Sequence, residues 1–283
     1  MTDAVASAPA SSANLGPGFD TISLALDLHC QVRVRRADEW SINHLGPERF
    51  VGDSSDDAIL DAAQGVSDTP LAIEVENSIP LSRGLGSSAA AFAAGGLAAM
   101  RASGRDPDQD ELFEFVRDRE GHPDNAAAAV YGGLAAVANG EVIHLTLSRD
   151  LIPVVAVPSV ELKTRDSRRA LRPAYEIDVM ARTLGRYTAL LEGLRTGSQE
   201  LLTLARGDEL HEVPRSELNP VVPRLMEIAR AAGALHSCWS GSGPSVLSFT
   251  TDESHANVVA ALESDLGKDG RVLVLAPDVL GAR

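Results

Sequence analysis

The fold is decided by one stretch of this sequence, Pro80-Leu81-Ser82-Arg83-Gly84-Leu85-Gly86-Ser87-Ser88-Ala89-Ala90. The pattern predicts a strand that ends at Ile79, a loop containing glycines, and a helix that begins at the paired serines. Gly84 and Gly86 allow positive φ angles and a close approach of the backbone to a ligand. A helix N-terminus offers unpaired N–H groups and the positive end of its dipole, which together attract an anion. The stretch therefore predicts either a phosphate-binding turn or a capped, buried helix after a tight turn.

The serines at the start of this helix have two predicted uses. Ser87 and Ser88 are suited to cap the helix, and one hydroxyl could also ligate Mg²⁺. Neither common nucleotide motif is present, because a Walker A loop needs a lysine that this stretch lacks, and the dinucleotide fingerprint has a different glycine spacing. The local sequence alone leaves phosphate binding and a structural turn equally open.

Strand and helix patterns alternate on both sides of this stretch. Alternating or continuous apolar residues predict strands at 30–34, 71–75, 151–157, 246–249 and 271–275. Helical patterns lie at 87–100, from Asp106 onward, and at 175–194, 199–206, 221–232 and 253–266. Asn139-Gly140 between two apolar runs predicts a hairpin. We therefore predict an α+β protein of two domains, residues 1–150 and 151–283.

Composition and charge limit the class of protein. Hydrophobic residues make up 44% of the chain, enough for a substantial core. The net charge of −15 argues against nucleic acid or an anionic membrane as partner. We find no secretory signal and no run near the roughly 18 apolar residues of a membrane span. Cys30 and Cys238 could form a disulfide, but buried thiols in a reducing compartment are expected, and the predicted location is cytoplasmic.

Two further glycine-rich segments accompany the first stretch. They are Ser11-Ser12-Ala13-Asn14-Leu15-Gly16-Pro17-Gly18-Phe19-Asp20 and Ser240-Gly241-Ser242-Gly243-Pro244. In this order and spacing, over the whole chain, the three segments resemble the motifs of the GHMP kinase superfamily, which is named for galactokinase, homoserine kinase, mevalonate kinase and phosphomevalonate kinase. The resemblance implies an N-terminal, ATP-binding domain of the ribosomal-S5-like α/β type and a C-terminal, ferredoxin-like α+β domain. It also implies that Ser240, Gly241, Ser242 and Gly243 form a structural glycine motif.

Within this superfamily the chain most resembles the homoserine kinases. Their first motif is similar to residues 12–20, and their middle motif to Glu120-Gly121-His122-Pro123-Asp124-Asn125 with Tyr131-Gly132-Gly133. Their two arginine-bearing segments are similar to Thr164-Arg165-Asp166-Ser167-Arg168 and Leu210-His211-Glu212-Val213-Pro214-Arg215. The resemblance implies ATP-dependent phosphorylation of L-homoserine to O-phospho-L-homoserine, a step of threonine biosynthesis, by a protein that forms a homodimer.

The chemistry of homoserine, a zwitterion with a primary hydroxyl, agrees with these motifs. Its carboxylate needs planar guanidinium groups, which Arg168 and Arg215 could supply. Its ammonium and hydroxyl need acceptors, which Asn14, Asp20 and His122 could supply. The plainer interpretation is that Asn14 and Asp20 stabilise a turn and that the arginines are solvated. A metal pair at His122 and Asp124 lacks further ligands at suitable spacing.

The resemblance also implies roles in phosphoryl transfer. The segment 80–88 wraps the triphosphate, and Ser88 and Glu120 hold Mg²⁺, with Ser87 as a rival ligand. Asp124 and Asn125 complete the catalytic set. The superfamily pattern puts a carboxylate base at Asp124, and direct proton loss to the phosphate is the alternative.

Two further residues are expected to contact the nucleotide. Arg83 is expected to touch phosphate oxygens or to point to solvent. Asp57 stands where homoserine kinases commonly carry an asparagine near the adenine, and it can accept from the adenine amino group but cannot donate to a ring nitrogen.

Two other functions stay open on the sequence alone. One is a GHMP kinase for another small alcohol, such as shikimate, mevalonate or pantoate, which would be favoured if Arg168 and Arg215 lay far from the glycine loop. The other is a non-catalytic nucleotide or metabolite sensor. The joint presence of Ser88, Glu120 and Asp124 argues against a sensor, because binding alone does not need a metal and acceptor set.

Overall fold

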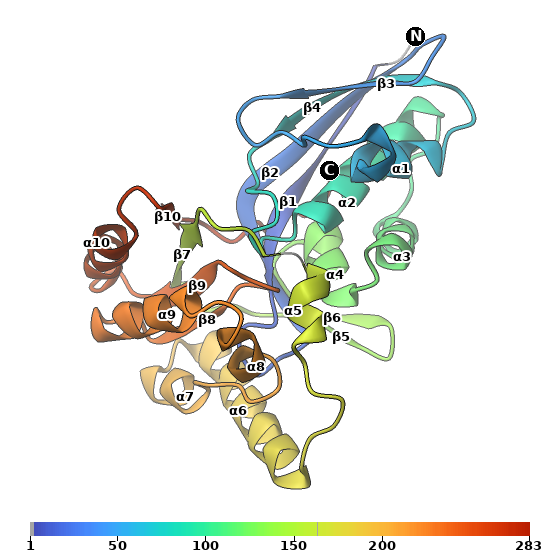
Figure 1. The fold of residues 1–283 in the computed structure, drawn as a ribbon. Coiled ribbons are helices and arrows are strands. Elements are labelled where there is room, and N and C mark those ends of the chain that lie inside the picture. The colour runs from blue at the N-terminus through green and yellow to red at the C-terminus, as the bar shows by residue number, and fades with distance from the viewer. Residues whose placement is uncertain (1–2, 163) are drawn as a thin grey trace.

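A computed structural model describes residues 3–162 and 164–283 as two β-sheets with helices packed against them (Figure 1). The first sheet consists of β1 (Ala4–Ala13), β2 (Ile22–Arg36), β3 (Ser41–Leu45), β4 (Leu71–Asn77), β5 (Leu134–Ala138) and β6 (Glu141–Leu145). Its order is β3-β4-β2-β5-β6, and β1 pairs with β2. The long strand β2 holds the sheet together, since its start pairs with β5 and its end with β4.

The predicted alternation in β2 is confirmed. Cys30, Val32 and Val34 are buried, whereas Gln31 and Arg33 between them are exposed. This period of two is what a strand with one covered face requires.

Helices cover the inner face of this sheet. They are the 3₁₀ helix η1 (Ser54–Asp56) and the α-helices α1 (Ala58–Gln64), α2 (Ser87–Ala102), α3 (Gln109–Glu120) and α4 (Pro123–Tyr131). Helix α2 packs on β1 and β2 and is flanked by α1 and α3 (Figure 1). Its Ala- and Gly-rich sequence makes this burial possible, because a Cβ atom at Gly96 would lie 2.3 Å from the Phe115 ring. The predicted buried helix is confirmed.

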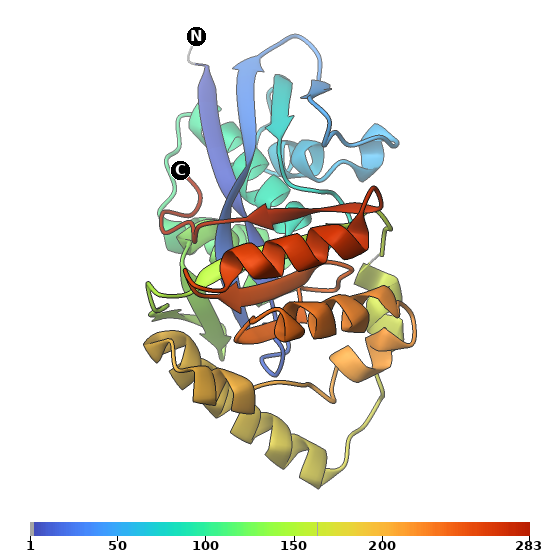
Figure 2. The ribbon, with the colours of Figure 1, turned by 90° about the vertical axis from the view of Figure 1, so that its left-hand side faces the viewer.

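The second sheet consists of β7 (Ile152–Pro158), β8 (His236–Trp239), β9 (Val246–Thr250) and β10 (Gly270–Val274). The helices of this part are α5 (Thr164–Arg169), α6 (Ile177–Thr196), α7 (Gln199–Leu204), α8 (Glu212–Ser216), α9 (Val221–Ala231) and α10 (His255–Leu266). Figure 2 shows α9 and α10, orange and red, in front of this sheet, and their apolar residues share a core with it.

The order β10-β7-β9-β8 is antiparallel throughout. With helices between β7 and β8 and between β9 and β10, this is the β-α-β-β-α-β arrangement of a ferredoxin-like unit. The predicted α+β class is confirmed.

The C-terminal segment returns to the first sheet. Ser7 and Arg283 exchange backbone hydrogen bonds of 2.8 and 2.9 Å, and Leu26 forms a bridge with Pro277. The final residues therefore contact the N-terminal part of the chain, and the division into domains at residue 150 stays a prediction.

Several predicted boundaries are shifted by a few residues. Strand β4 ends at Asn77 and not at Ile79, and α3 begins at Gln109 because Asp108, not Asp106, accepts the capping hydrogen bond. Cys30 and Cys238 are free, buried thiols, as expected. Among the described helices, none has the length and apolar character needed to cross a membrane.

Candidate active site

The glycine loop before α2 has the backbone that its sequence predicts. Gly84 and Gly86 have φ angles of +74° and +63°, and Gly86 is the N-cap of α2. The expected capping by Ser87 or Ser88 is wrong, because no side chain caps this helix and the two serines are already its first residues. The absence of a side-chain cap leaves the first N–H groups of the helix for an anion.

The third glycine motif packs directly against this loop. A Cβ atom at Gly84 would lie 2.2 Å from the Ser240 carbonyl oxygen, so only glycine fits there. The Ser240 hydroxyl donates to the Gly84 carbonyl at 2.7 Å and lies 2.8 Å from the Ser12 hydroxyl. The Gly241 N–H donates to the Ala13 carbonyl at 3.0 Å. Segments from the start, middle and end of the chain thus meet at one point.

A cavity of about 290 Å³ lies at this meeting point. Its lining includes every residue predicted for catalysis or substrate binding, together with part of the glycine loop and of the third motif: Asn14, Asp20, Ser82, Gly84, Leu85, Gly86, Ser87, Ser88, Glu120, His122, Asp124, Asn125, Arg168, Arg215, Gly241 and Ser242. The roles of these residues stay predictions. Another alcohol as substrate would have been favoured if Arg168 and Arg215 lay far from the glycine loop. Both arginines line the same cavity as the loop, so this condition is not met.

One wall of this cavity carries a hydroxyl and a carboxylate in contact. The Ser88 Oγ lies 2.5 Å from Glu120 Oε2, and the Glu120 side chain is only 11% exposed. Burial raises the pKa of Glu120 to about 7. A bound cation would favour the ionised carboxylate, and hydroxyl and carboxylate oxygens are ligands that Mg²⁺ prefers. The residues present therefore fit a magnesium ion, and Ser88, not Ser87, is the serine that contacts the carboxylate.

Two arginines provide positive charge in the same cavity. Arg168 Nη2 donates to Asp20 Oδ1 at 2.6 Å, and Arg215 Nη1 donates to the Gly241 carbonyl at 3.0 Å. The Nε atoms of both arginines are buried and have no hydrogen-bond partner among the described residues. Buried donors without partners are unfavourable, and a carboxylate ligand would satisfy them.

Three further cavity residues, His122, Asp124 and Asn125, lie at the start of α4. His122 is the N-cap residue of α4, and burial together with the Arg168 charge lowers its pKa. Asp124 is almost completely buried, and burial and the Asp20 charge raise its pKa to about 7. The Asn125 side-chain oxygen accepts from the Ser11 hydroxyl at 2.9 Å. These contacts fix the middle motif beside the first motif.

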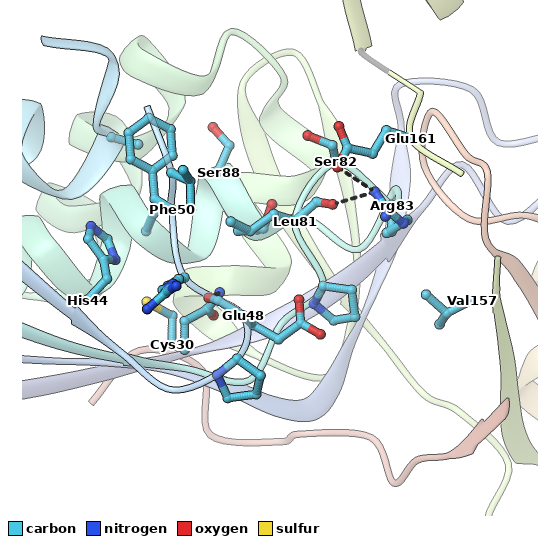
Figure 3. Close-up of a pocket in the computed structure, with 18 of the residues that line it drawn as sticks. Cys30, His44, Glu48, Phe50, Leu81, Ser82, Arg83, Ser88, Val157 and Glu161 are labelled. Carbon is cyan, nitrogen blue, oxygen red and sulfur yellow. Dashed lines mark hydrogen bonds and ion pairs between the residues drawn. The ribbon is translucent and has the colours of Figure 1, made fainter. Parts of the chain in front are cut away.

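A second cavity, of about 900 Å³, shares Ser82, Ser87 and Ser88 with the first. It continues between β2, β4 and the segment before α1, and Figure 3 shows several of the side chains that line it. Asp57 lines this cavity, but its carboxylate caps α1 by accepting from Ile59 and Leu60 N–H groups. Its second oxygen lies 2.5 Å from His44 Nε2. Contact of Asp57 with adenine stays a prediction. The same carboxylate also has a structural role as the cap of α1.

One of the two expectations for Arg83, a side chain that points to solvent, is wrong. Its guanidinium donates to the carbonyl oxygens of Leu81 (3.1 Å), Pro158 (3.0 Å) and Ser159 (2.6 Å), and it pairs with Glu161 at 3.3 Å. Figure 3 shows Leu81 and Glu161 beside Arg83. The side chain is 16% exposed and does not point freely to solvent, whereas its contact with a phosphate stays a prediction. It ties the glycine loop to the end of β7 instead.

Some residues that line the larger cavity belong to no motif that the sequence reveals. Cys30, His44 and Asn77 line the larger cavity, yet each lies in an ordinary strand pattern. A different acidic cluster, Asp27, His29 and Asp278, has atoms close enough for a metal, but the Arg283 guanidinium already lies 3.2 Å from both His29 and Asp278. It therefore acts as an anchor for the C-terminal residue.

Comparisons with known proteins agree with this geometry. The family models described as "GHMP kinases N terminal domain" and "GHMP kinases C terminal" match residues 56–133 and 188–268. The chain is 37% identical to a homoserine kinase of Trichormus variabilis, covering 97% of this chain and 96% of the relative. It is 36% identical to one of Thermus thermophilus, covering 94% of each. The solved homoserine kinase of Cytophaga hutchinsonii is similar with a TM-score of 0.90 and 26% identity, covering 100% of this chain and 97% of that one.

Proposed function

The chain belongs to the homoserine kinases of the GHMP kinase superfamily and has their activity, the ATP-dependent phosphorylation of homoserine; on this premise we propose how its two cavities divide the reaction. The smaller cavity binds L-homoserine and the larger one binds the nucleoside of ATP. The observation that supports this division is that the two cavities share Ser82, Ser87 and Ser88, at the glycine loop. A phosphate held there would lie between both ligands.

The arginines bind the carboxylate of homoserine. Arg168 and Arg215 line the smaller cavity, and each has a buried Nε without a partner in the described part of the chain. A guanidinium binds a carboxylate through two parallel hydrogen bonds, which would satisfy these atoms.

The ammonium group of homoserine binds Asp20 and Asn14. Without a ligand, Asp20 pairs with Arg168 at 2.6 Å. A zwitterion can replace this ion pair with two others, because its ammonium satisfies Asp20 while its carboxylate satisfies Arg168. Binding of an amino acid therefore leaves neither charge unpaired.

The hydroxyl of homoserine lies near His122, Asp124 and Asn125. The triphosphate lies along the segment 80–88, with the N-terminus of α2 directed at it. Phosphoryl transfer has a loose transition state and asks chiefly for positioning and charge stabilisation, so we assign no residue as a base.

Ser88 and Glu120 would hold Mg²⁺. When bound, the ion neutralises charge on the β- and γ-phosphates. Glu120 is suited to this role because it is a buried carboxylate with no cation to balance its charge among the described residues, apart from His122 Nδ1 at 4.0 Å.

The proposal is tested by a coupled ADP-release assay with homoserine, shikimate, mevalonate and pantoate as acceptors. We expect turnover with homoserine and at least about a hundredfold lower kcat/KM with the acceptors that lack an amino group, because they leave Asp20 unpaired. A preference for an acceptor without an amino group would overturn the assignment of the smaller cavity.

A further inference from the structure

We propose that His211 is a positioning residue that aims the Arg215 guanidinium at the substrate carboxylate. The inference rests on the proposed binding of homoserine by Arg215. It concerns a side chain that lies behind the arginine and does not line the smaller cavity.

The hydrogen bonds of His211 fix one tautomer of its ring. Arg215 Nη1 lies 2.9 Å from His211 Nδ1, and a guanidinium nitrogen can only donate, so Nδ1 is the acceptor and carries no proton. The proton must then be on Nε2, which lies 2.8 Å from the Gly16 carbonyl oxygen and donates to it. The ring thus connects Arg215 with the turn of the first motif.

The ring has to be neutral for this arrangement, since an imidazolium has no acceptor. His211 is completely buried, and burial, followed by the Arg215 charge, lowers its pKa to about 3. Asp208 Oδ2 lies 3.7 Å from Nε2, but this carboxylate already accepts the backbone N–H groups of His211 and Glu212. The acceptor for Arg215 is therefore present at every pH at which a kinase works.

The hydrogen bonds of Arg215 Nη1 determine which edge of its guanidinium is free to bind a ligand. Arg215 Nη1 is used by His211 and by the Gly241 carbonyl, whereas Nε has no partner among the described residues. The edge formed by Nε and Nη2 is the one that binds a carboxylate side-on. Phe19 supports the pair, because its ring stacks on His211 at 5.4 Å and lies 5.6 Å from Arg215 Cζ.

The same ring links both charged ends of the substrate site. Gly16 lies in the turn between Asn14 and Asp20, the predicted acceptors for the ammonium group. A displacement of His211 would therefore move Arg215 relative to these acceptors. A shift of this kind weakens substrate binding more than the chemical step.

Two substitutions separate the two hydrogen bonds of the ring. In His211→Gln the amide reaches the position of Nε2, so the bond to Gly16 is kept and the acceptor for Arg215 is lost. In His211→Asn the amide oxygen replaces Nδ1, so the acceptor for Arg215 is kept. We expect His211→Gln to raise the KM for homoserine about tenfold with kcat within about threefold, and His211→Asn to change that KM by less than about threefold.

His236 provides the matched control. It is equally buried and lies 3.1 Å from the Leu15 carbonyl in the same turn, but it contacts no arginine of the substrate site in the described structure. We expect His236→Gln to lower the melting temperature without raising the KM for homoserine more than about threefold, and we expect the KM for ATP to stay within about twofold in every variant. Equal KM increases in His211→Gln and either other variant would overturn the proposal.

A measurement on the unaltered protein keeps the proposal testable if the variants do not fold. ¹⁵N NMR of the His211 ring at pH 7 should show a neutral ring protonated on Nε2, and a ring protonated on Nδ1 would contradict the proposal. The two proposals also fail separately. An unaltered protein that does not phosphorylate homoserine removes the proposed function, whereas an active protein with an unchanged KM in His211→Gln removes only the role of His211.

Discussion

The surroundings of Glu120 suit the cation site that we propose for it. Its carboxyl group is buried beside the Ser88 hydroxyl, and burial raises its pKa to about 7. A carboxylate that is costly to ionise alone gains most from a divalent ion, because the ion replaces the lost hydration. Because the folded state disfavours the ionised carboxylate, the charge of Glu120 does not stabilise the fold at neutral pH.

We therefore predict that Glu120→Gln separates activity from stability. The amide keeps the shape and the contact with Ser88 but loses the charge, so turnover should fall about a hundredfold or more. The far-UV circular dichroism spectrum should stay unchanged, and the melting temperature should not fall, because ionisation of this buried carboxyl group opposes folding. Glu114→Gln on the exposed face of the same helix is the control and should keep full turnover. Nearly unchanged activity in Glu120→Gln would remove Glu120 from the metal site.

Arg168 and its neighbours allow an equally direct comparison. Arg168→Gln should raise the KM for homoserine about tenfold or more and leave the KM for ATP unchanged. The substitution removes one of the two guanidinium groups that bind the substrate carboxylate, and it leaves Asp20 without its ion-pair partner. Arg169→Gln lies on the same short helix with its side chain 69% exposed, and it should have normal kinetics. Steady-state kinetics with each substrate varied in turn make this test, and equal effects of both substitutions would argue against a substrate contact.

Glu212 is a buried carboxyl outside both cavities. Its Oε1 accepts the Trp239 N–H at 2.9 Å, and no ion pair is found for it in the described part of the chain. Burial raises its pKa from 4.5 to about 7. Between these values the folded protein holds a proton that the unfolded chain releases, so the stability from this group is complete below pH 4.5 and is lost as the pH rises through 7.

We predict that Glu212→Gln stabilises the protein above pH 7. The amide accepts the same hydrogen bond without a buried charge, so the free energy of unfolding at pH 8.5 should rise by about 1–2 kcal/mol, and the difference should vanish near pH 5. Urea unfolding at both pH values measures this, with the exposed Glu217→Gln as control. A stability gain that is the same at both pH values would exclude ionisation as its cause.

At the scale of elements, the glycine loop depends on contact with the third motif as well as on its own backbone. Gly84 and Gly104 both have positive φ angles, +74° and +81°. A Cβ atom at Gly84 would lie 2.2 Å from the Ser240 carbonyl oxygen, whereas one at Gly104 would meet nothing within 4 Å. The two glycines therefore share the conformational requirement and differ only in the close approach.

This difference predicts the outcome of two alanine substitutions. Gly104→Ala should cost about 1 kcal/mol of stability, because of its positive φ, and leave the kinetics unchanged. Gly84→Ala should cost more and should also raise the KM for ATP several-fold, because the loop must move away from Ser240. Thermal unfolding and ATP kinetics on the two variants make the comparison. An unaltered KM for ATP in Gly84→Ala would mean that the contact with the third motif does not position the loop.

The elements also show where sequence patterns are informative. The hairpin between β5 and β6 could be predicted because Asn139 and Gly140, with φ angles of 52° and 85°, are residues that its turn requires. Strand β1 could not, because apart from Val5 its Ala- and Ser-rich sequence lacks the β-branched and aromatic residues that favour strands. It is covered by β2 and by helices α2 and α4, and small residues are what such close packing demands.

In the candidate site, too, some features could be predicted from the sequence and others could not. The motifs indicated most of the residues that line the smaller cavity, because each motif combines a glycine turn with polar side chains. The contacts of Arg83 could not be predicted, since two of its acceptors, the carbonyls of Pro158 and Ser159, lie in β7 and just after it. The role of His211 depends likewise on Gly16, from the opposite end of the chain. Tertiary partners of this kind leave no local pattern.

At the scale of the whole molecule, the protein binds a polyanion against its own field. The net charge is −15, and the glycine loop contains no lysine. Its single arginine, Arg83, is occupied by three carbonyl oxygens and Glu161. The glycine loop itself therefore offers a triphosphate backbone N–H groups and the N-terminus of α2, and we expect these to contribute more than Arg49, Lys268 and Arg271, which line the larger cavity. Salt weakens such short-range contacts little, but it screens the long-range repulsion between the protein and the nucleotide.

This balance predicts an unusual salt dependence. Raising KCl from about 0.02 M to about 0.2 M shortens the screening length from roughly 20 Å to under 10 Å, so the KM for MgATP should fall by about twofold. A kinase that holds phosphate with exposed lysines would show the opposite trend, because salt would screen the attraction. The KM for homoserine serves as the internal control, since this zwitterion has no net charge and should respond much less. Steady-state kinetics across the salt series decide the matter: a KM for MgATP that rises steeply would show that side-chain cations, and not the helix terminus and backbone of the loop, hold the triphosphate.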